Sequence, residues 1–139
     1  MLSLLIMADA LALVAEPDTA QRQLITGTLE LVGYRVLASS TPLQLDVELH
    51  STVAFTSRSL LLVLDPSFGA ECARPLATLL RGRASAGIAS PQVVLIRTPK
   101  ESDGFGDLGL STSPQVLGAP FDSVELERIA RRCRVANGP

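Results

Sequence analysis

The sequence predicts an α/β protein in which a parallel sheet is covered by helices on both faces. Short apolar runs, typical of buried strands, alternate along the chain with segments whose apolar residues follow a helical period. One of these runs, LLLVLD at residues 60–65, ends in a carboxylate. The carboxyl end of a buried parallel strand lies at the edge where open α/β folds bind ligands. Asp65 is therefore the first candidate for a functional residue.

Composition limits both the size and the partners of the protein. A chain of 139 residues, of which 47% are hydrophobic, suits one domain with a sizeable core. The net charge of -2 gives no basic surface for phosphates, so we expect no nucleic-acid partner. Cys72, Cys133 and the single histidine, His50, lie far apart in sequence, which favours neither a zinc cluster nor a disulfide framework. We expect a reducing, cytoplasmic compartment.

The first residues, MLSLLIMAD, form an apolar extension ahead of the domain. They resemble a secretory signal, but no Lys or Arg precedes Arg22, and Asp9 interrupts the apolar run. The run is also too short to span a membrane. We therefore predict an extension at residues 1–9, a domain at residues 10–135 and a tail at residues 136–139.

The first half of the predicted domain begins with a strand at residues 10–15. Asp18, with Gln21 three residues later, has the pattern of a helix N-cap, and Gly33 is expected to end that helix. The apolar face of this helix comprises Leu24, Ile25, Leu29 and Val32. A second strand is predicted at residues 34–38.

Residues 43–49 fit two interpretations. Their leucines and valine alternate with polar residues, as in a strand, whereas Thr41 and Pro42 suit the cap and first position of a helix. We favour the helix.

The second half continues the alternation. A third strand is predicted at residues 60–64, and a short or kinked helix is expected to begin near Pro75. Its inward residues are Leu76, Leu79 and Leu80. Further strands are predicted at residues 92–96 and 115–118.

The last predicted helix opens with Asp122 and Glu125, which together have the pattern of a capping box. Its apolar stripe comprises Leu126, Ile129, Ala130 and Cys133.

Four motifs in this order resemble the receiver domains of bacterial two-component response regulators. They are ALVAEPD (residues 12–18), LLLVLD (60–65), VVLIRT (93–98) and LGAPFDSVEL (117–126). The resemblance runs from Leu11 to about Arg134. It implies a flavodoxin-like, CheY-like doubly wound sheet of five parallel strands, in order 2-1-3-4-5, with five helices.

The resemblance also assigns roles to three residues. Asp65 takes the position of the phospho-acceptor, Thr98 that of the hydroxyl that contacts the phosphoryl group, and Glu16 that of the first of two paired acids. In active members of the family, these acids and the acceptor hold magnesium.

Three other positions depart from the family pattern. The second acid is replaced by Pro17, which has no side-chain oxygen, and the lysine of the family's KPF turn is replaced by Ala119. The aromatic switch position is Val116. Phosphoryl transfer to a carboxylate needs positive charge near the phosphoryl oxygens, so these losses predict weak metal binding or none and inefficient phosphorylation.

Each site residue also has a purely structural interpretation. Asp65 would end its strand and cap the following turn, and Thr98 would be a satisfied hydroxyl at a strand end. Glu16 would be a solvated loop acid. Asp18 is a possible substitute metal ligand, but we expect it to cap its helix instead.

The GxGxxG pattern of Gly104, Gly106 and Gly109 does not lie directly between a strand and a helix, so we do not interpret it as a dinucleotide site. Residues 102–113 take the family's fourth-helix position, where these glycines disfavour a helix and predict a degenerate one.

The sequence thus predicts a degenerate receiver, or pseudo-receiver: a non-enzymatic signalling module that binds a protein, or a second copy of itself, through the region from Ser102 to Cys133. No cofactor is expected. One alternative is a working phosphorelay receiver, phosphorylated on Asp65 with Mg²⁺. The other is a flavodoxin-like small-ligand binder, against which stand the aromatic content of 4% and the lack of a phosphate-cradling loop after the first strand.

Overall fold

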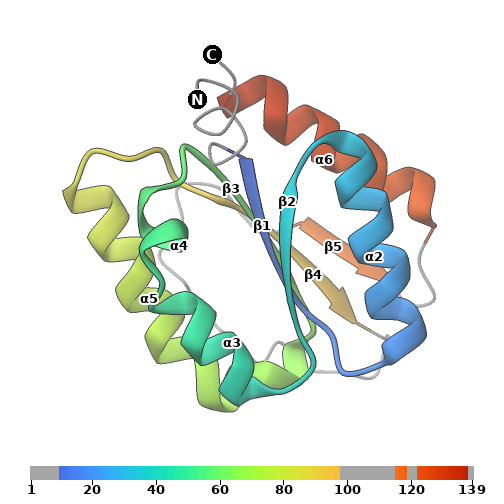
Figure 1. Cartoon of the computed structure of the whole chain (residues 1–139), viewed down its shortest axis with the longest axis horizontal. Helices are drawn as coiled ribbons and strands as arrows, with labels where there is room; N and C mark the ends of the chain where they lie inside the picture. Colours follow the sequence, from blue (N-terminus) through green and yellow to red (C-terminus); the bar gives the residue numbers. More distant parts are fainter. Residues whose placement is uncertain (1–9, 98–114, 119–121, 138–139) are drawn as a thin grey trace.

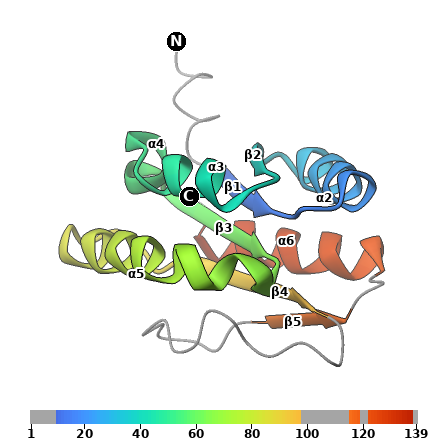
Figure 2. The same ribbon diagram turned by 90° about the horizontal axis from the view of Figure 1, so that it is seen from below.

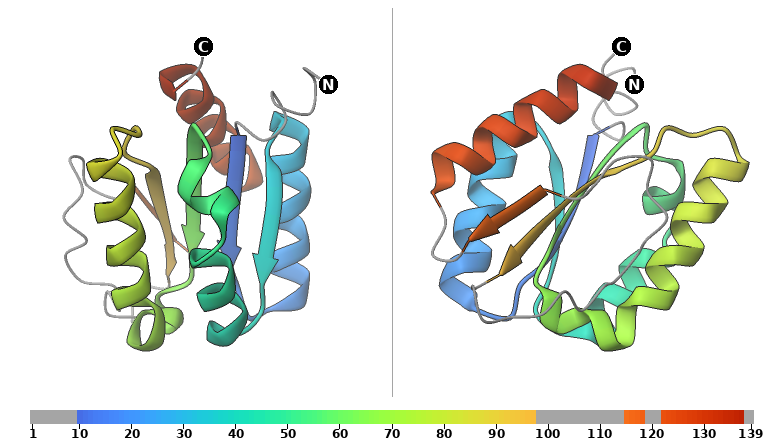
Figure 3. Two further views of the ribbon diagram at one scale, coloured as in Figure 1. Left: turned by 60° about the vertical axis from the view of Figure 1, so that its left-hand side comes forward. Right: turned by 180° about the vertical axis from the view of Figure 1, so that it is seen from behind.

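Five parallel strands form the centre of the molecule in the order β2-β1-β3-β4-β5, as predicted. The computed structural model describes residues 10–97, 115–118 and 122–137. The strands are β1 (Ala10–Ala15), β2 (Arg35–Ser39), β3 (Ser59–Leu64), β4 (Gln92–Arg97) and β5 (Gln115–Gly118). Their arrowheads point to the same edge of the sheet (Figure 3). This is the carboxyl edge, where the sequence places Asp65.

Two helices, α2 (Thr19–Val32) and α6 (Ser123–Asn137), cover one face of the sheet (Figure 1). Helix α2 ends at Gly33, whose φ of 105° lies in the left-handed region that glycine tolerates best. The backbone N–H of Tyr34 donates to the carbonyl of Leu29, so this residue completes the helix end. For this reason β2 begins at Arg35, one residue later than predicted.

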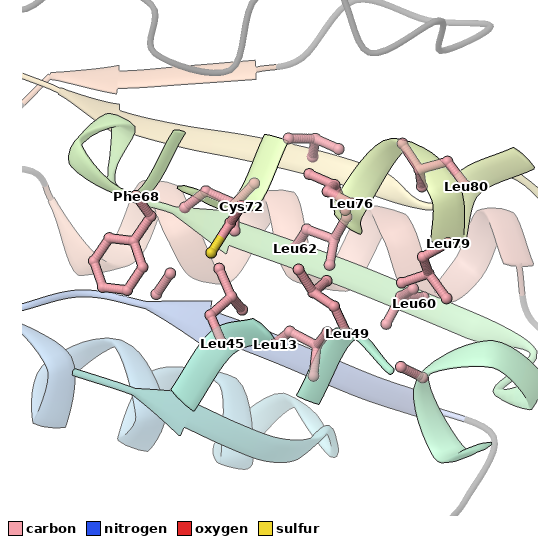
Figure 4. Packing of buried hydrophobic residues seen from close by; sticks show 14 of the residues in the cluster. Leu13, Leu45, Leu49, Leu60, Leu62, Phe68, Cys72, Leu76, Leu79 and Leu80 are labelled. Atoms are coloured by element: carbon pink, nitrogen blue, oxygen red, sulfur yellow. The ribbon is translucent and has the colours of Figure 1, made fainter. Parts of the chain in front are cut away.

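The opposite face carries α3 (Pro42–Leu49), α4 (Thr52–Thr56), the 3-10 turn η1 (Pro66–Phe68) and α5 (Gly69–Ser85). Figure 2 shows these helices and the α2/α6 pair on opposite sides of the strands. In Figure 4 the labelled side chains of α5 meet those of α3 and the central strands. These labelled core residues are Leu13, Leu45, Leu49, Leu60, Leu62, Phe68, Cys72, Leu76, Leu79 and Leu80.

A short or kinked helix was predicted to begin near Pro75, and this start was wrong. Helix α5 begins at Gly69 and contains Pro75 in its interior. A proline inside a helix removes one backbone hydrogen bond. Here the helix also buries a continuous stripe from Cys72 through Leu76 to Leu80, and the stripe outweighs that loss.

Residues 42–49 form a helix, as favoured, with Thr41 as its cap: the Thr41 hydroxyl accepts from the N–H of Gln44. The strand-like alternation arises because Leu45 and Leu49 are buried while Leu43 and Val47 lie on the outer face, 74% and 62% exposed. The short helix α4, capped by Ser51, was not predicted.

No helix in the described ranges combines the length and the apolar character needed to cross a bilayer. Cys72 and Cys133 are both buried free thiols. They belong to the cores on opposite faces of the sheet, which leaves no route to a bond between them.

Candidate functional site

Glu16 and Asp65 lie side by side at the carboxyl edge of the sheet. Strands β1 and β3 pair Ala15 with Leu64, so the two acids occupy the next position of that register. The N–H of Asp65 donates to the carbonyl of Ala15 (2.9 Å), and the N–H of Glu16 donates to that of Ser39 on β2 (3.1 Å). The backbone therefore fixes both acids relative to the sheet.

The carboxylate of Glu16 is buried, with 2% of the residue exposed. One oxygen, Oε2, accepts the backbone N–H of Asp18 (3.0 Å), and the other, Oε1, accepts the side-chain amide of Gln21. The prediction of a solvated loop acid was therefore wrong. The turn from β1 into α2 folds back over Glu16, and both of its oxygens have donors within that turn.

Asp18 and Arg22 complete this turn. Asp18 caps α2, as expected, because its Oδ2 accepts the N–H of Gln21 (2.8 Å). The guanidinium of Arg22 donates to the carbonyls of Glu16 (3.0 Å) and Pro17 (3.3 Å). This cation thus binds the loop backbone.

Asp65 caps the turn that follows β3. Its Oδ1 accepts the N–H of Ser67 (2.9 Å), and it is the N-cap of the 3-10 turn. Asp65 is partly exposed, unlike Glu16. The capping role foreseen for this carboxylate is present, and it engages one of the two oxygens.

The remaining predicted positions divide between described and undescribed residues. Pro17 is exposed at the edge, and Val116 is exposed on β5. Thr98 and Ala119 lie outside the described residues, as do the glycines of the GxGxxG pattern and all of residues 102–113, for which a degenerate helix was predicted. Their assigned roles stay predictions.

Burial raises the pKa of Glu16 above its ordinary value. The hydrogen bonds from Asp18 and Gln21 act in the opposite direction, and the neighbouring charges of Asp65 and Asp18 raise the pKa further. The fold therefore holds the proton of Glu16 to a higher pH than the unfolded chain does.

This shift predicts a pH-dependent stability. Starting at pH 4.5, the ordinary pKa of a glutamate, the folded state binds more protons than the unfolded state until the raised pKa is passed. The free energy of unfolding therefore falls as pH rises through that window. Glu16→Gln does not titrate, so wild type should lose stability relative to this variant as pH rises. Urea unfolding of both proteins across this window measures the difference, and parallel pH curves would contradict the assignment.

Sequence reasoning missed Gln21 and Arg22 as parts of this edge. The spacing of Asp18 and Gln21 was interpreted only as the pattern of a helix N-cap. In the structure, the Gln21 amide and the Asp18 N–H also both donate to Glu16. The spacing from Asp18 placed Gln21 in the first turn of the helix. The contacts of Arg22 could not be predicted in this way, because they depend on the path of the loop.

No protein-family model matches the chain, and no curated protein matches it either. Solved structures do share its fold. A receiver domain protein (CheY-like) from Methanospirillum hungatei JF-1 superposes with a TM-score of 0.64 at 14% identity, covering 93% of this chain and 97% of that one.

Two further structures show the same likeness. The receiver domain of a sensor histidine kinase from Pseudomonas aeruginosa PAO1, described with magnesium coordinated in its active site cleft, has a TM-score of 0.59 at 19% identity, covering 88% and 95% of the two chains. A putative pilus assembly-related protein from Burkholderia pseudomallei K96243 has a TM-score of 0.59 at 18% identity, covering 96% and 94%. The chain therefore has the CheY-like, flavodoxin-type receiver fold.

As far as its residues are described, the acidic edge does not fit a magnesium ion. Magnesium requires near-octahedral oxygen ligands, commonly including carboxylates. Both oxygens of Glu16 already accept N–H groups, and Pro17 offers no side-chain oxygen. Within residues 10–97, 115–118 and 122–137, no three His, Cys, Asp or Glu residues are grouped so that they could hold a metal.

Proposed function

We propose that this chain is an atypical receiver, a pseudo-receiver, that acts in signal transduction as a protein interaction module largely independent of phosphorylation. The observation that carries the proposal is the engagement of Glu16. Its carboxylate accepts hydrogen bonds from Asp18 and Gln21, so it is not presented to an ion. The CheY-like fold supports a role in signalling.

The chemistry of phosphoryl transfer supports this proposal. Transfer to a carboxylate relies on cations that offset the charge of the phosphoryl oxygens. At this edge two carboxylates lie close enough for the charge of Asp65 to raise the pKa of Glu16. The lysine of the family turn is Ala119, and the aromatic switch residue is Val116, which has no ring to move between two positions.

The second candidate function is that of a phosphorelay receiver. One observation favours it: Asp65 lies at the carboxyl end of β3 and is partly exposed, as an acceptor must be. Under this alternative Asp65 accepts phosphate with Mg²⁺ and loses it slowly. The small-ligand binder stays a weaker prediction, because no described feature favours it over the other two.

For the partner, we propose a protein, either a signalling protein or a second copy of this chain, bound through the region from Ser102 to Cys133. The described part of this region includes β5 and most of α6, where Val116 and Val124 are 49% and 60% exposed. Exposed apolar side chains of this kind are suited to a protein contact. We place the protein in the cytoplasm and propose no nucleic-acid partner, in keeping with its net charge of -2.

Intact-mass measurement after incubation with acetyl phosphate and Mg²⁺ tests the proposal. We expect neither wild type nor Asp65→Asn to carry a stoichiometric phosphoryl adduct. A stoichiometric adduct in wild type that disappears in Asp65→Asn would establish the phosphorelay alternative.

A further inference from the structure

The acidic edge contains a set of hydrogen-bond donors that belongs to the chain itself. Glu16 is buried at the end of β1, where an unpaired carboxylate would be costly. Its two oxygens are satisfied separately, one by the backbone of Asp18 and one by the side chain of Gln21. Hydrogen bonds to a carboxylate are among the stronger ones in proteins.

These donors come from one short segment. Asp18 also caps α2, Gln21 lies in its first turn, and Arg22 ties the carbonyls of Glu16 and Pro17 to the same turn. These hydrogen bonds connect the start of α2, which supplies the donors, to the end of β1, which supplies the acceptors. A loop connected in this way has one preferred conformation, set by protein groups.

We propose that Gln21 is a positioning residue that replaces a divalent cation at this edge: together with the Asp18 N–H it holds Glu16 inward and fixes the β1–α2 loop without metal. This inference deepens the proposed function and rests on it, because a metal-free edge needs another means of holding its acids. It also explains why Pro17 is tolerated: a loop held by Glu16, Gln21 and Arg22 does not require a second acid.

Amide hydrogen exchange tests the role of Gln21. Gln21→Met keeps the length of the side chain and removes its donor, and Gln23→Met is the matched control, since Gln23 is exposed on the same helix. Without the hydrogen bond from Gln21, Glu16 should leave the Asp18 N–H more often. We expect this N–H to exchange about tenfold faster in Gln21→Met, a change equivalent to losing one charge-assisted hydrogen bond. The control should match wild type. Unchanged exchange in Gln21→Met would overturn the inference.

Restoring the second acid at position 17 makes Mn²⁺ affinity a second test of Gln21. A purely structural role of Gln21 would not change this affinity. In Pro17→Asp the second acid returns, but Gln21 still engages Glu16. The double variant Pro17→Asp/Gln21→Met should therefore bind Mn²⁺ about tenfold more tightly than Pro17→Asp, as measured by isothermal titration calorimetry. Equal affinities would show that Gln21 does not withhold Glu16 from metal.

The two proposals fail separately. Phosphorylation of Asp65 in wild type would contradict the proposed function, whatever the exchange data show. Normal exchange and equal Mn²⁺ affinities in the Gln21 variants, without phosphorylation of Asp65, would contradict only the role given to Gln21.

Discussion

Arg83→Met should lower the free energy of unfolding by about 3 kcal/mol, because it removes a buried cation that several carbonyls share. Arg83 is 1% exposed. Its Nη1 donates to the carbonyls of Ala54 (3.0 Å), Phe55 (3.1 Å) and Ser57 (2.7 Å), and its Nη2 donates to that of Ala89 (3.1 Å). Methionine keeps most of the apolar stem but leaves these carbonyls without their donor.

The position of Arg83 explains the size of this effect. Its side chain leaves α5 and joins the end of α4 to the segment that leads into β4, so three elements depend on one guanidinium. Burial lowers the pKa of Arg83, yet a guanidinium remains protonated in proteins. Among the described residues, its four side-chain hydrogen bonds all go to neutral backbone carbonyls.

Urea unfolding of matched variants measures this contribution. Arg81 is exposed on the same helix, and Arg81→Met should change stability by no more than about 0.5 kcal/mol. Arg83→Lys keeps the charge but loses the planar fork, so it should fall between wild type and Arg83→Met. If Arg83→Met and Arg81→Met unfold at the same urea concentration, the shared-cation account is wrong.

Gly33→Ala should cost about 2 kcal/mol or more, for two separable reasons. Gly33 has a φ of 105°, and an L-residue in the left-handed region costs roughly 1–2 kcal/mol. In addition, a Cβ at this position would meet Nη1 of Arg134, so the end of this flexible side chain would have to move away. That nitrogen donates to the carbonyl of Val32 (3.0 Å), and the guanidinium lies 5.9 Å from the centre of the Tyr34 ring. The substitution therefore also disturbs the contact between α2 and α6.

A double-mutant cycle separates the two costs. In an Arg134→Ala background the collision is gone, so Gly33→Ala should cost only the backbone part. Gly87 is a matched control: its φ is 77°, and no atom outside its immediate neighbours lies within 4 Å of an added Cβ. Gly87→Ala should therefore show the backbone cost alone, roughly 1–2 kcal/mol. An equal cost of Gly33→Ala with and without Arg134 would contradict the collision.

The sheet was predictable because its strands coincide with short apolar runs in the sequence. The apolar runs of β1 and β3 are buried throughout, which is the pattern expected of central parallel strands. Helix α3 was harder, since Leu43 and Val47 are apolar but face outward. Only Thr41 and Pro42, as the cap and first position of a helix, distinguished it from a strand.

The errors have a common origin in long-range packing. The proline rule placed the start of α5 near Pro75, but the burial of Cys72 and Leu76 against the sheet extends the helix back to Gly69. Arg83 is not distinguished in sequence from the exposed Arg81, because the carbonyls that it binds come from other elements.

The candidate site was predictable in its positions but not in its contacts. The sequence placed Glu16 and Asp65 at neighbouring strand ends and foresaw the capping roles of Asp18 and Asp65. The burial of Glu16 could not be predicted, because it depends on how residues 17–22 fold back over the carboxylate.

The most direct test of the central claim is a ¹H–¹⁵N correlation spectrum recorded with EDTA, with Mg²⁺, and with Mg²⁺ plus beryllofluoride, which mimics an aspartyl phosphate. If this edge does not convert a phosphoryl group into a conformational change, the three spectra should superimpose at Glu16, Asp65 and Val116. Saturable shifts at Asp65 that extend to Val116 on β5 only when both Mg²⁺ and beryllofluoride are present would contradict it.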